Sequence, residues 1–441
     1  MYKEGGQRRI RRCIEKMKAQ DSVKNYYPTM RMYTNFAVRT IRKVCAEIGP
    51  REAGTQAELD GQNYMAKAVG DAADEIKQEE FRLSPRAFLG WPRLSGIFLL
   101  IALACGLVNL ILNKVLSQEA NWAPWVFVGI SVFMLAMIMT EFLFYSKFLD
   151  PFCRKATSHN TYCIRKASGE TKRRIIIGGH SDSSIEWRPT HMGGAPFLYT
   201  AIGYPIAGWI YTFVMGVIML AMHKFMPVLV YIDCAFIPGY VFLLFFMNYK
   251  VCVDGANDNL SGCMTAGAVL KFMGDNDIRF ENTEVVAMFS GAEESGLRGA
   301  KAAAKLHPEF KDPDVETVFI AFDTIKDYDD MAIYLRDMSG VVGHDKRAVE
   351  LIHKAGEQVE LDIPKVTMFA GASDAAAMSQ AGIPAALFAA MNPGPPKYYH
   401  TRDDKADILE PRTIEKCLDM ALNMVFLFDE QGRQTPYTQQ N

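Results

Sequence analysis

The sequence predicts an α/β fold, with a largely parallel sheet covered by helices on both faces, interrupted by four transmembrane helices. Two observations predict it. Four apolar runs of membrane-crossing length divide the chain, and the last polar segment alternates short strand-like runs with helical ones. The 441 residues are enough for one large α/β domain with extra segments.

Each apolar run is long enough to cross about 30 Å of hydrocarbon as a helix. Buried core helices usually keep a polar stripe, which these runs lack, so we expect membrane spans. Asp233, in the fourth run, is either a functional intramembrane carboxylate or a group that faces the bundle or an interface. The runs are residues 96–113, 122–140, 199–222 and 226–248.

The apolar runs form two hairpins with short connections, so each hairpin returns the chain to the side that it left. The far connections, residues 114–121 and 223–225, carry only Lys114 and Lys224 as cations. The near flanks are richer in cations, and the positive-inside rule places them in the cytoplasm. These near-side cations are Arg82, Arg86, Arg93, Lys147, Arg154, Lys155 and Lys250.

The cysteines and the N-terminus agree with that orientation. The nine cysteines include no CxxC pair and have no regular spacing, as expected for reduced thiols. The first residues are charged and lack the apolar core of a secretory signal. We therefore expect an integral protein of the cell (inner) membrane whose polar segments face the cytoplasm.

The chain thus divides into polar segments that share one domain and two hairpins inserted between them. The net charge of −2 argues against a nucleic-acid partner, whose binding needs a basic excess. The predicted boundaries are residues 1–93, 147–197 and 250–430 for the soluble domain, 94–146 and 198–249 for the transmembrane hairpins, and 431–441 for a flexible tail.

The periodicity of apolar residues, together with helix-breaking and helix-capping residues, predicts the helices and strands of the polar segments. Gly49-Pro50 ends a first amphipathic helix, and Thr55 is a plausible N-cap for a second. The β-branched run at 174–178 is typical of a buried strand. The predicted helices are 33–48, 56–74, 260–274, 297–306, 346–358 and 375–381; the predicted strands are 174–178, 283–289, 315–322 and 385–389.

Chemistry-bearing side chains follow these strands. Functional residues in such sheets gather in loops at the carboxyl ends of strands, so we expect these residues to meet. His180 and Asp182 follow the first strand, Glu293 and Glu294 the second, and Asp323 the third; Asp258 precedes the 260–274 helix and His400 lies in a late loop.

Imidazole nitrogens and carboxylate oxygens are ligands that zinc accepts without a thiolate. Two imidazoles and three carboxylates suffice for two metals if one carboxylate bridges. The pair Glu293-Glu294 can supply one ligand and one free base, and Asp182 can orient the His180 ring. Taken singly, Asp258 could be only an N-cap and the glutamates only a solvated helix start. Their joint placement favours the metal site.

These residues resemble those of metallopeptidase family twenty-eight, the co-catalytic di-zinc aminopeptidases. The resemblance extends over all three polar segments, in the order of the family. It rests on six motifs: GPREAGT (49–55), GGHSDS (178–183), GANDNLSG (255–262), FSGAEESGLRGA (289–300), GASDAAAMSQAGIPA (371–385) and YYHTRDD (398–404).

The resemblance implies an αβα sandwich around a mixed, mostly parallel sheet, and two zinc ions per chain. His180 and Asp323 would bind one zinc, Glu294 and His400 the other, and Asp258 would bridge them. Glu293 would be the general base, and the activity would be removal of N-terminal residues from peptides. The residues that bind the substrate cannot be assigned, because the sequence departs from the family around Asp323 and after Ser373-Asp374.

The second hairpin is inserted between two ligands of one proposed metal, His180 and Asp258. Its ends must then lie near the active site, and we expect the cleft to open near the membrane surface. The sequence leaves open whether the hairpins contact lipid alone, a partner protein or a second copy of the chain. Alternative functions are a glutaminyl cyclase, a carboxypeptidase, a non-catalytic receptor or scaffold, and a transporter, for which the spans offer little translocation path.

Overall fold

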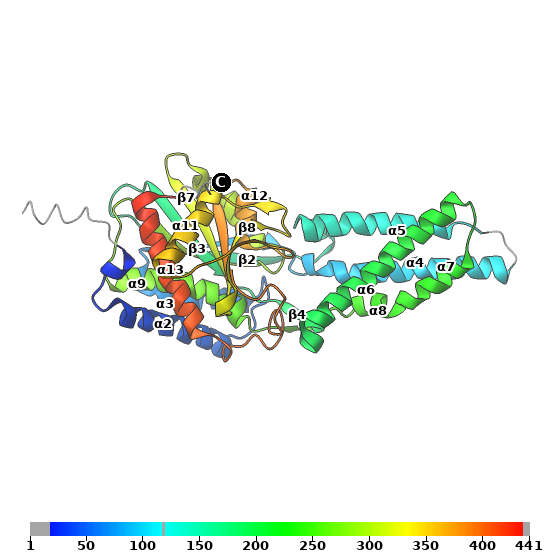
Figure 1. Cartoon of the computed structure of the whole chain (residues 1–441), viewed down its shortest axis with the longest axis horizontal. Coiled ribbons are helices and arrows are strands. Elements are labelled where there is room, and N and C mark those ends of the chain that lie inside the picture. Colours follow the sequence, from blue (N-terminus) through cyan, green and yellow to red (C-terminus); the bar gives the residue numbers. More distant parts are fainter. Residues whose placement is uncertain (1–17, 117–119, 435–441) are drawn as a thin grey trace, which may run out of the picture.

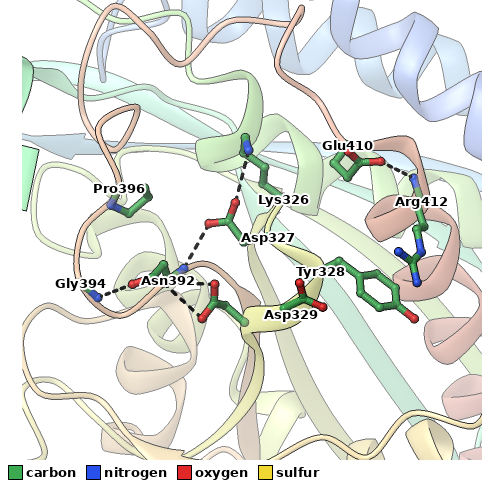
Figure 2. Close-up of a pocket in the computed structure, with 10 residues that line it drawn as sticks. Lys326, Asp327, Tyr328, Asp329, Asn392, Gly394, Pro396, Glu410 and Arg412 are labelled. Atoms are coloured by element: carbon green, nitrogen blue, oxygen red, sulfur yellow. Dashed lines mark hydrogen bonds and ion pairs between the residues drawn. The ribbon is translucent and has the colours of Figure 1, made fainter.

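The computed structural model describes residues 18–116 and 120–434 and consists of an α/β domain from which a helical bundle projects (Figure 1). Strands of one sheet come from before the first hairpin, from between the hairpins and from after the second. The predicted flexible tail, 431–441, falls mostly outside the described residues.

The sheet has nine strands in the order β1-β2-β6-β3-β7-β11-β8-β10, and β9 pairs with β8. The strands are β1 (Glu75–Leu83), β2 (Ala156–Arg165), β3 (Arg173–His180), β6 (Thr283–Ser290), β7 (Glu316–Ile325), β8 (Met331–Asp337), β9 (Val342–Gly343), β10 (Lys365–Thr367) and β11 (Ala385–Ala390). The four central strands, β6, β3, β7 and β11, are parallel. The outer pairs β1–β2, β2–β6, β11–β8 and β8–β9 are antiparallel. The sheet is therefore mixed, and the expected parallel arrangement holds mainly at its centre.

Helices cover both faces of this sheet. Alternate residues of a buried strand face opposite sides, and β3 shows this directly. Ile175 and Ile177 pack with one core cluster, and Ile176 packs with the other. Helices on the first face are α2 (Tyr26–Glu47), α3 (Gln56–Val69), α9 (Ser261–Asp275), α11 (Lys346–Gln358) and α13 (Pro411–Gln431); those on the second are α10 (Arg298–Leu306) and α12 (Asp374–Gln380).

Most elements predicted from the pattern are confirmed. Helix α11 has the predicted bounds, and Thr55 caps α3 by accepting a hydrogen bond from the Glu58 backbone N–H. Helix α3 ends at Val69, however, earlier than predicted, because β1 begins at Glu75. Asp323 was expected after its strand, but β7 extends to Ile325 and includes it.

The bundle contains three helices long and apolar enough to cross a membrane: Phe88–Lys114, Ala123–Leu143 and Arg188–Ala221. The first comprises α4 (Trp91–Lys114), the second α5 (Ala123–Ile138) and a π-helical turn, and the third is α6. Many large apolar side chains on the bundle point outward. Among them are Ile111, Val132 and Ile210, each more than half exposed.

The fourth apolar run does not form one long helix. It forms α7 (Pro227–Asp233), a 3₁₀ turn at Cys234–Phe236 and α8 (Ile237–Leu243), and its last residues enter strand β5 (Met247–Cys252). At about 1.5 Å per residue, the helical part from Pro227 to Leu243 is roughly 25 Å long. This segment runs back along α6 (Figure 1).

Strand β4 (Ile185–Trp187) pairs antiparallel with β5, so the two ends of the second hairpin are joined by a small sheet. Gly193 and Gly194 depart from helical geometry inside α6 and separate its first turn from the long apolar part. Because β4 directly follows the His180 loop, the base of the hairpin lies beside the predicted site.

Candidate metal centre

The parallel centre of the sheet brings the predicted residues together. His180 is the last residue of β3, and Glu293 and Glu294 follow the adjacent strand β6. Asp323 lies near the end of β7, on the other side of β3. Asp258 lies in the turn Ala256–Leu260 that leads into α9, and His400 lies in the loop before α13.

Asp258 lies between the two histidines. Its Oδ1 is 3.1 Å from His180 Nε2, and its Oδ2 is 3.1 Å from His400 Nε2. His400 Nε2 is also 3.1 Å from Glu294 Oε1. Asp323 Oδ1 lies 4.0 Å from His180 Nε2, and Glu293 Oε2 lies 3.9 Å from the same nitrogen.

Three groups of these side chains each offer ligand atoms within 4.8 Å of one another: His180–Asp258–Asp323, Asp258–Glu294–His400 and His180–Glu293–Glu294. The first two share Asp258 and correspond to the two ligand sets implied by the family resemblance. Beyond their contacts with His400, the buried atoms Asp258 Oδ2 and Glu294 Oε1 have no hydrogen-bond partner among the described residues. Buried unpartnered carboxylate oxygens facing imidazole nitrogens fit a divalent cation such as zinc.

Burial and like charges shift the protonation of this cluster. Burial raises the pKa of Glu293 well above its usual value, and the neighbouring Glu294, Asp374 and Asp323 raise it further. Burial, with the charge of Asp258, raises the pKa of Asp323 to about 7. So many acidic groups in one buried place need cations, because uncompensated buried charge is costly.

For the two histidines, burial lowers the pKa, but the neighbouring carboxylates raise it by more. Burial alone would lower the pKa of His180, but Glu293, Asp182 and Asp258 raise it well above its usual value. Burial likewise opposes the charge of His400, yet Glu294 and Asp258 raise its pKa to about 10. In the metal-free protein the two imidazolium groups thus partly neutralise the carboxylates. A metal would displace these protons, because a ligating imidazole is neutral.

Asp182 differs from its predicted role of orienting His180 with its carboxylate. The His180 Nδ1 hydrogen bond is to the backbone carbonyl of Asp182, at 3.1 Å, while Asp182 Oδ1 lies 3.4 Å away. The carboxylate instead accepts hydrogen bonds from the backbone N–H groups of Glu293, at 3.0 Å, and Glu294, at 3.1 Å. Asp182 therefore orients the imidazole through its backbone and holds the Glu293–Glu294 loop through its side chain.

Two residues of this centre received no role from the sequence. The Asp404 carboxylate accepts hydrogen bonds from the backbone N–H groups of Asn257 and Asp258 and from the Asn257 side chain. Trp187 places its indole edge-on to the His400 imidazole, with ring centroids 4.6 Å apart. Asp404 ends the YYHTRDD motif, which could have suggested a role, whereas no local pattern marks Trp187.

A comparison with family models matches part of the chain. Residues 242–425 match the model of peptidase family M28. The match confirms the family resemblance for less than half of the chain; this M28 region includes Asp258, Glu293, Glu294, Asp323 and His400 but not His180. No curated protein matches the sequence.

Several solved structures resemble most of the chain in fold. An aminopeptidase from Aneurinibacillus sp. strain AM-1 is 15% identical, with a TM-score of 0.53 and coverage of 95% of this chain and 98% of that chain. A zinc aminopeptidase from Bacillus subtilis is 15% identical, with a TM-score of 0.51 and coverage of 89% and 94%. A glutaminyl cyclase from Fimbriiglobus ruber is 13% identical, with a TM-score of 0.51 and coverage of 89% and 95%. The M28 match supports a peptidase, and the aminopeptidase neighbours share its fold.

Proposed function

We propose that this protein is an integral membrane zinc exopeptidase that removes N-terminal residues from peptides. The observation that carries the proposal is the pair of ligand groups that share Asp258. Two such groups with a common carboxylate fit two zinc ions per chain. The M28 region and the aminopeptidase fold neighbours support the same reaction class.

In this proposal His180 and Asp323 would hold one ion, Glu294 and His400 would hold the other, and Asp258 would be a ligand in both groups. Zinc, when bound, supplies a Lewis acid that polarises a carbonyl and acidifies water. The five side chains are largely buried and come from five different loops or strand ends, so the fold rather than local sequence sets their spacing.

Glu293 is the proposed general base. Its carboxylate is not needed as a ligand in the two groups that share Asp258. Its raised pKa, caused first by burial, makes it a better proton acceptor than an exposed glutamate. It takes a proton from the water that attacks the peptide carbonyl and gives a proton to the departing amine. Asp182 holds the Glu293 backbone and so fixes where this carboxylate lies.

We also propose that all four apolar segments cross the bilayer as two hairpins, with the α/β domain in the cytoplasm. The three long apolar helices and the outward-facing apolar side chains support membrane insertion. The pairing of β4 with β5 supports an even number of crossings in the second hairpin. Because Trp187 contacts His400, we infer that the site is close to the membrane surface and acts on peptides that reach it there.

The test of the reaction combines metal analysis with a peptidase assay on the wild type and Glu293→Gln. We expect two zinc ions per chain in both proteins and a loss of turnover of at least about 100-fold in the variant alone. Full turnover of Glu293→Gln on peptides with a free N-terminus would refute the mechanism. One zinc per chain together with cyclisation of N-terminal glutamine would instead favour the glutaminyl cyclase alternative.

The test of orientation uses single cysteines in a cysteine-free background. Lys224 lies in the connection of the second hairpin and Lys250 lies on β5, and both side chains are exposed. A membrane-impermeant maleimide applied to intact cells should label Lys224→Cys and leave Lys250→Cys unlabelled until the membrane is opened. The reverse pattern would place the site outside the cytoplasm.

A further inference from the structure

The two ring nitrogens of His400 have different surroundings. Its Nε2 faces Asp258 and Glu294, so this nitrogen is the one available to a metal. Ligating histidines almost always donate their other ring N–H to a carboxylate, a carbonyl or water. Among the described residues, however, the buried Nδ1 of His400 has no hydrogen-bond partner.

Aromatic rings hold the imidazole instead. Tyr399 stacks on His400, with centroids 3.9 Å apart and planes at 20°. Trp187 meets it edge-on, with centroids 4.6 Å apart and planes at 81°. The two rings restrict the imidazole from two directions, and Trp187 in turn packs on Phe246 at 5.8 Å.

Trp187 also holds the backbone of His400. His400 has a φ of 54°, a left-handed conformation that is unfavourable for a residue with a side chain. Such conformations persist only where the surroundings enforce them. The backbone N–H of Trp187 donates to the His400 carbonyl at 2.8 Å. One residue therefore restrains both the peptide and the ring of His400.

Trp187 is itself fixed by the base of the second hairpin. It is the last residue of β4, pairs with Met247 of β5 and is followed at once by α6. Its neighbour Glu186 is buried and makes two hydrogen bonds to Arg402, at 2.6 and 2.7 Å, two residues after His400. Asn248 of β5 donates to Glu186 at 2.7 Å. The base of the hairpin thus contacts this loop at His400 and again at Arg402.

We propose that Trp187, supported by Glu186 and Arg402, is a positioning residue that presents His400 to its metal ion, so that the ends of a membrane hairpin complete the metal centre. This proposal rests on the proposed function only in taking His400 as a ligand. Losing the support of a ligating group typically costs about 10–100-fold in metal affinity. The loss of affinity should affect the ion that Glu294 and His400 would hold.

The test measures zinc dissociation constants by chelator competition on the full-length protein in nanodiscs, without substrate. His180→Ala and His400→Ala identify which constant belongs to which ion. Trp187→Ala should raise the dissociation constant of the zinc ion held by His400 about 10–100-fold. The dissociation constant of the other ion should stay within error of the wild-type value. Trp187→Phe, which keeps a ring, should restore most of the affinity.

Trp209→Ala is the matched control, since it removes a tryptophan from α6 at a position outside the pairing of β4 with β5. We expect both constants to stay at wild-type values. The proposal would be overturned if Trp187→Ala left both zinc dissociation constants unchanged. It would also be overturned if both tryptophan variants weakened the binding of both ions equally. If Trp187→Ala does not fold, Arg402→Gln is the deciding variant, because the Arg402 side chain is half exposed. It should weaken zinc binding at the His400 site by a smaller factor. An unchanged dissociation constant at that site would overturn the proposal.

These measurements are independent of peptide cleavage. A single zinc per chain in the wild type would count against the proposed function, whereas two ions with a Trp187-insensitive His400 site would count only against the positioning role.

Discussion

The carboxylate of Asp182 accepts a hydrogen bond of 3.0 Å from the backbone N–H of Glu293. It accepts a second from Glu294, so one buried side chain fixes the loop that carries both the proposed base and a proposed ligand. The His180 ring also faces this carboxylate, with Nδ1 3.4 Å from Asp182 Oδ1.

Asp182→Asn should therefore lower kcat more than it raises KM. An amide can accept through only one oxygen, so one of the two loop hydrogen bonds is lost and its N–H faces an N–H₂ group. We expect a loss of about 10–100-fold in activity, with zinc still bound by His180. Steady-state kinetics and metal analysis check this. An unchanged kcat would show that the loop holds its position without Asp182.

Asp404→Asn should weaken metal binding by about 10–100-fold, because Asp404 organises the turn that presents Asp258. Asp403→Asn is the matched control, since the neighbouring Asp403 side chain is 43% exposed and its ion pairs, with Lys397 and His191, are both 3.9 Å long. Chelator competition on both variants measures the effect. Equal affinities in the two would contradict the assigned role of Asp404.

The metal-free protein should lose stability as pH rises from about 4 to about 7. Burial raises the pKa of Asp374 to about 6 and that of Asp404 to about 7. Between an ordinary carboxyl pKa of about 4 and these values, the folded state binds more protons than the unfolded state, so raising the pH favours unfolding.

Melting temperatures of chelator-treated protein across this range test the pH dependence. Asp374→Asn should flatten the curve between about pH 4 and 6, because that proton is no longer exchanged. A metal-free protein whose melting temperature rises over the same range would contradict the assignment.

Gly96→Val should disrupt the packing of α4 against α8. A Cβ at Gly96 would lie 2.7 Å from the Tyr240 carbonyl oxygen and 3.0 Å from the Leu243 Cβ, closer than such atoms pack. Small residues allow this close approach of transmembrane helices, and overpacking costs about 1–3 kcal/mol. Gly129→Val on α5 is the control, because a Cβ there meets nothing within 4 Å. Detergent-resistance or thermal unfolding of both variants measures the difference; equal stability would argue against tight packing.

The sequence predicted which side chains come together better than it predicted the residues around them. His180 ends a strand, and Glu293 and Glu294 follow another, and the apolar runs of both strands are plain. Parallel strands bring such positions to one edge of the sheet. Trp187 and Asp404 both act on residues more than 100 positions away along the chain. The YYHTRDD motif at least includes Asp404, whereas no local spacing marks Trp187.

The errors at the level of secondary structure also have physical reasons. Strand β1 reads as polar because it is an edge strand with mostly exposed, charged side chains, and edge strands commonly carry charges. The fourth apolar run is broken because Pro238 lacks a backbone donor and its last residues pair as β5. Composition alone could not distinguish that broken helix from a continuous one.

The strand order has a consequence for how the protein is made. Strand β6 lies between β2 and β3, yet it is synthesised after the second hairpin, whereas β2 and β3 precede it. A growing chain therefore cannot close the centre of its sheet until that hairpin has left the ribosome. A nascent chain stalled before Thr283 exposes unpaired strand edges that chaperones and proteases can recognise.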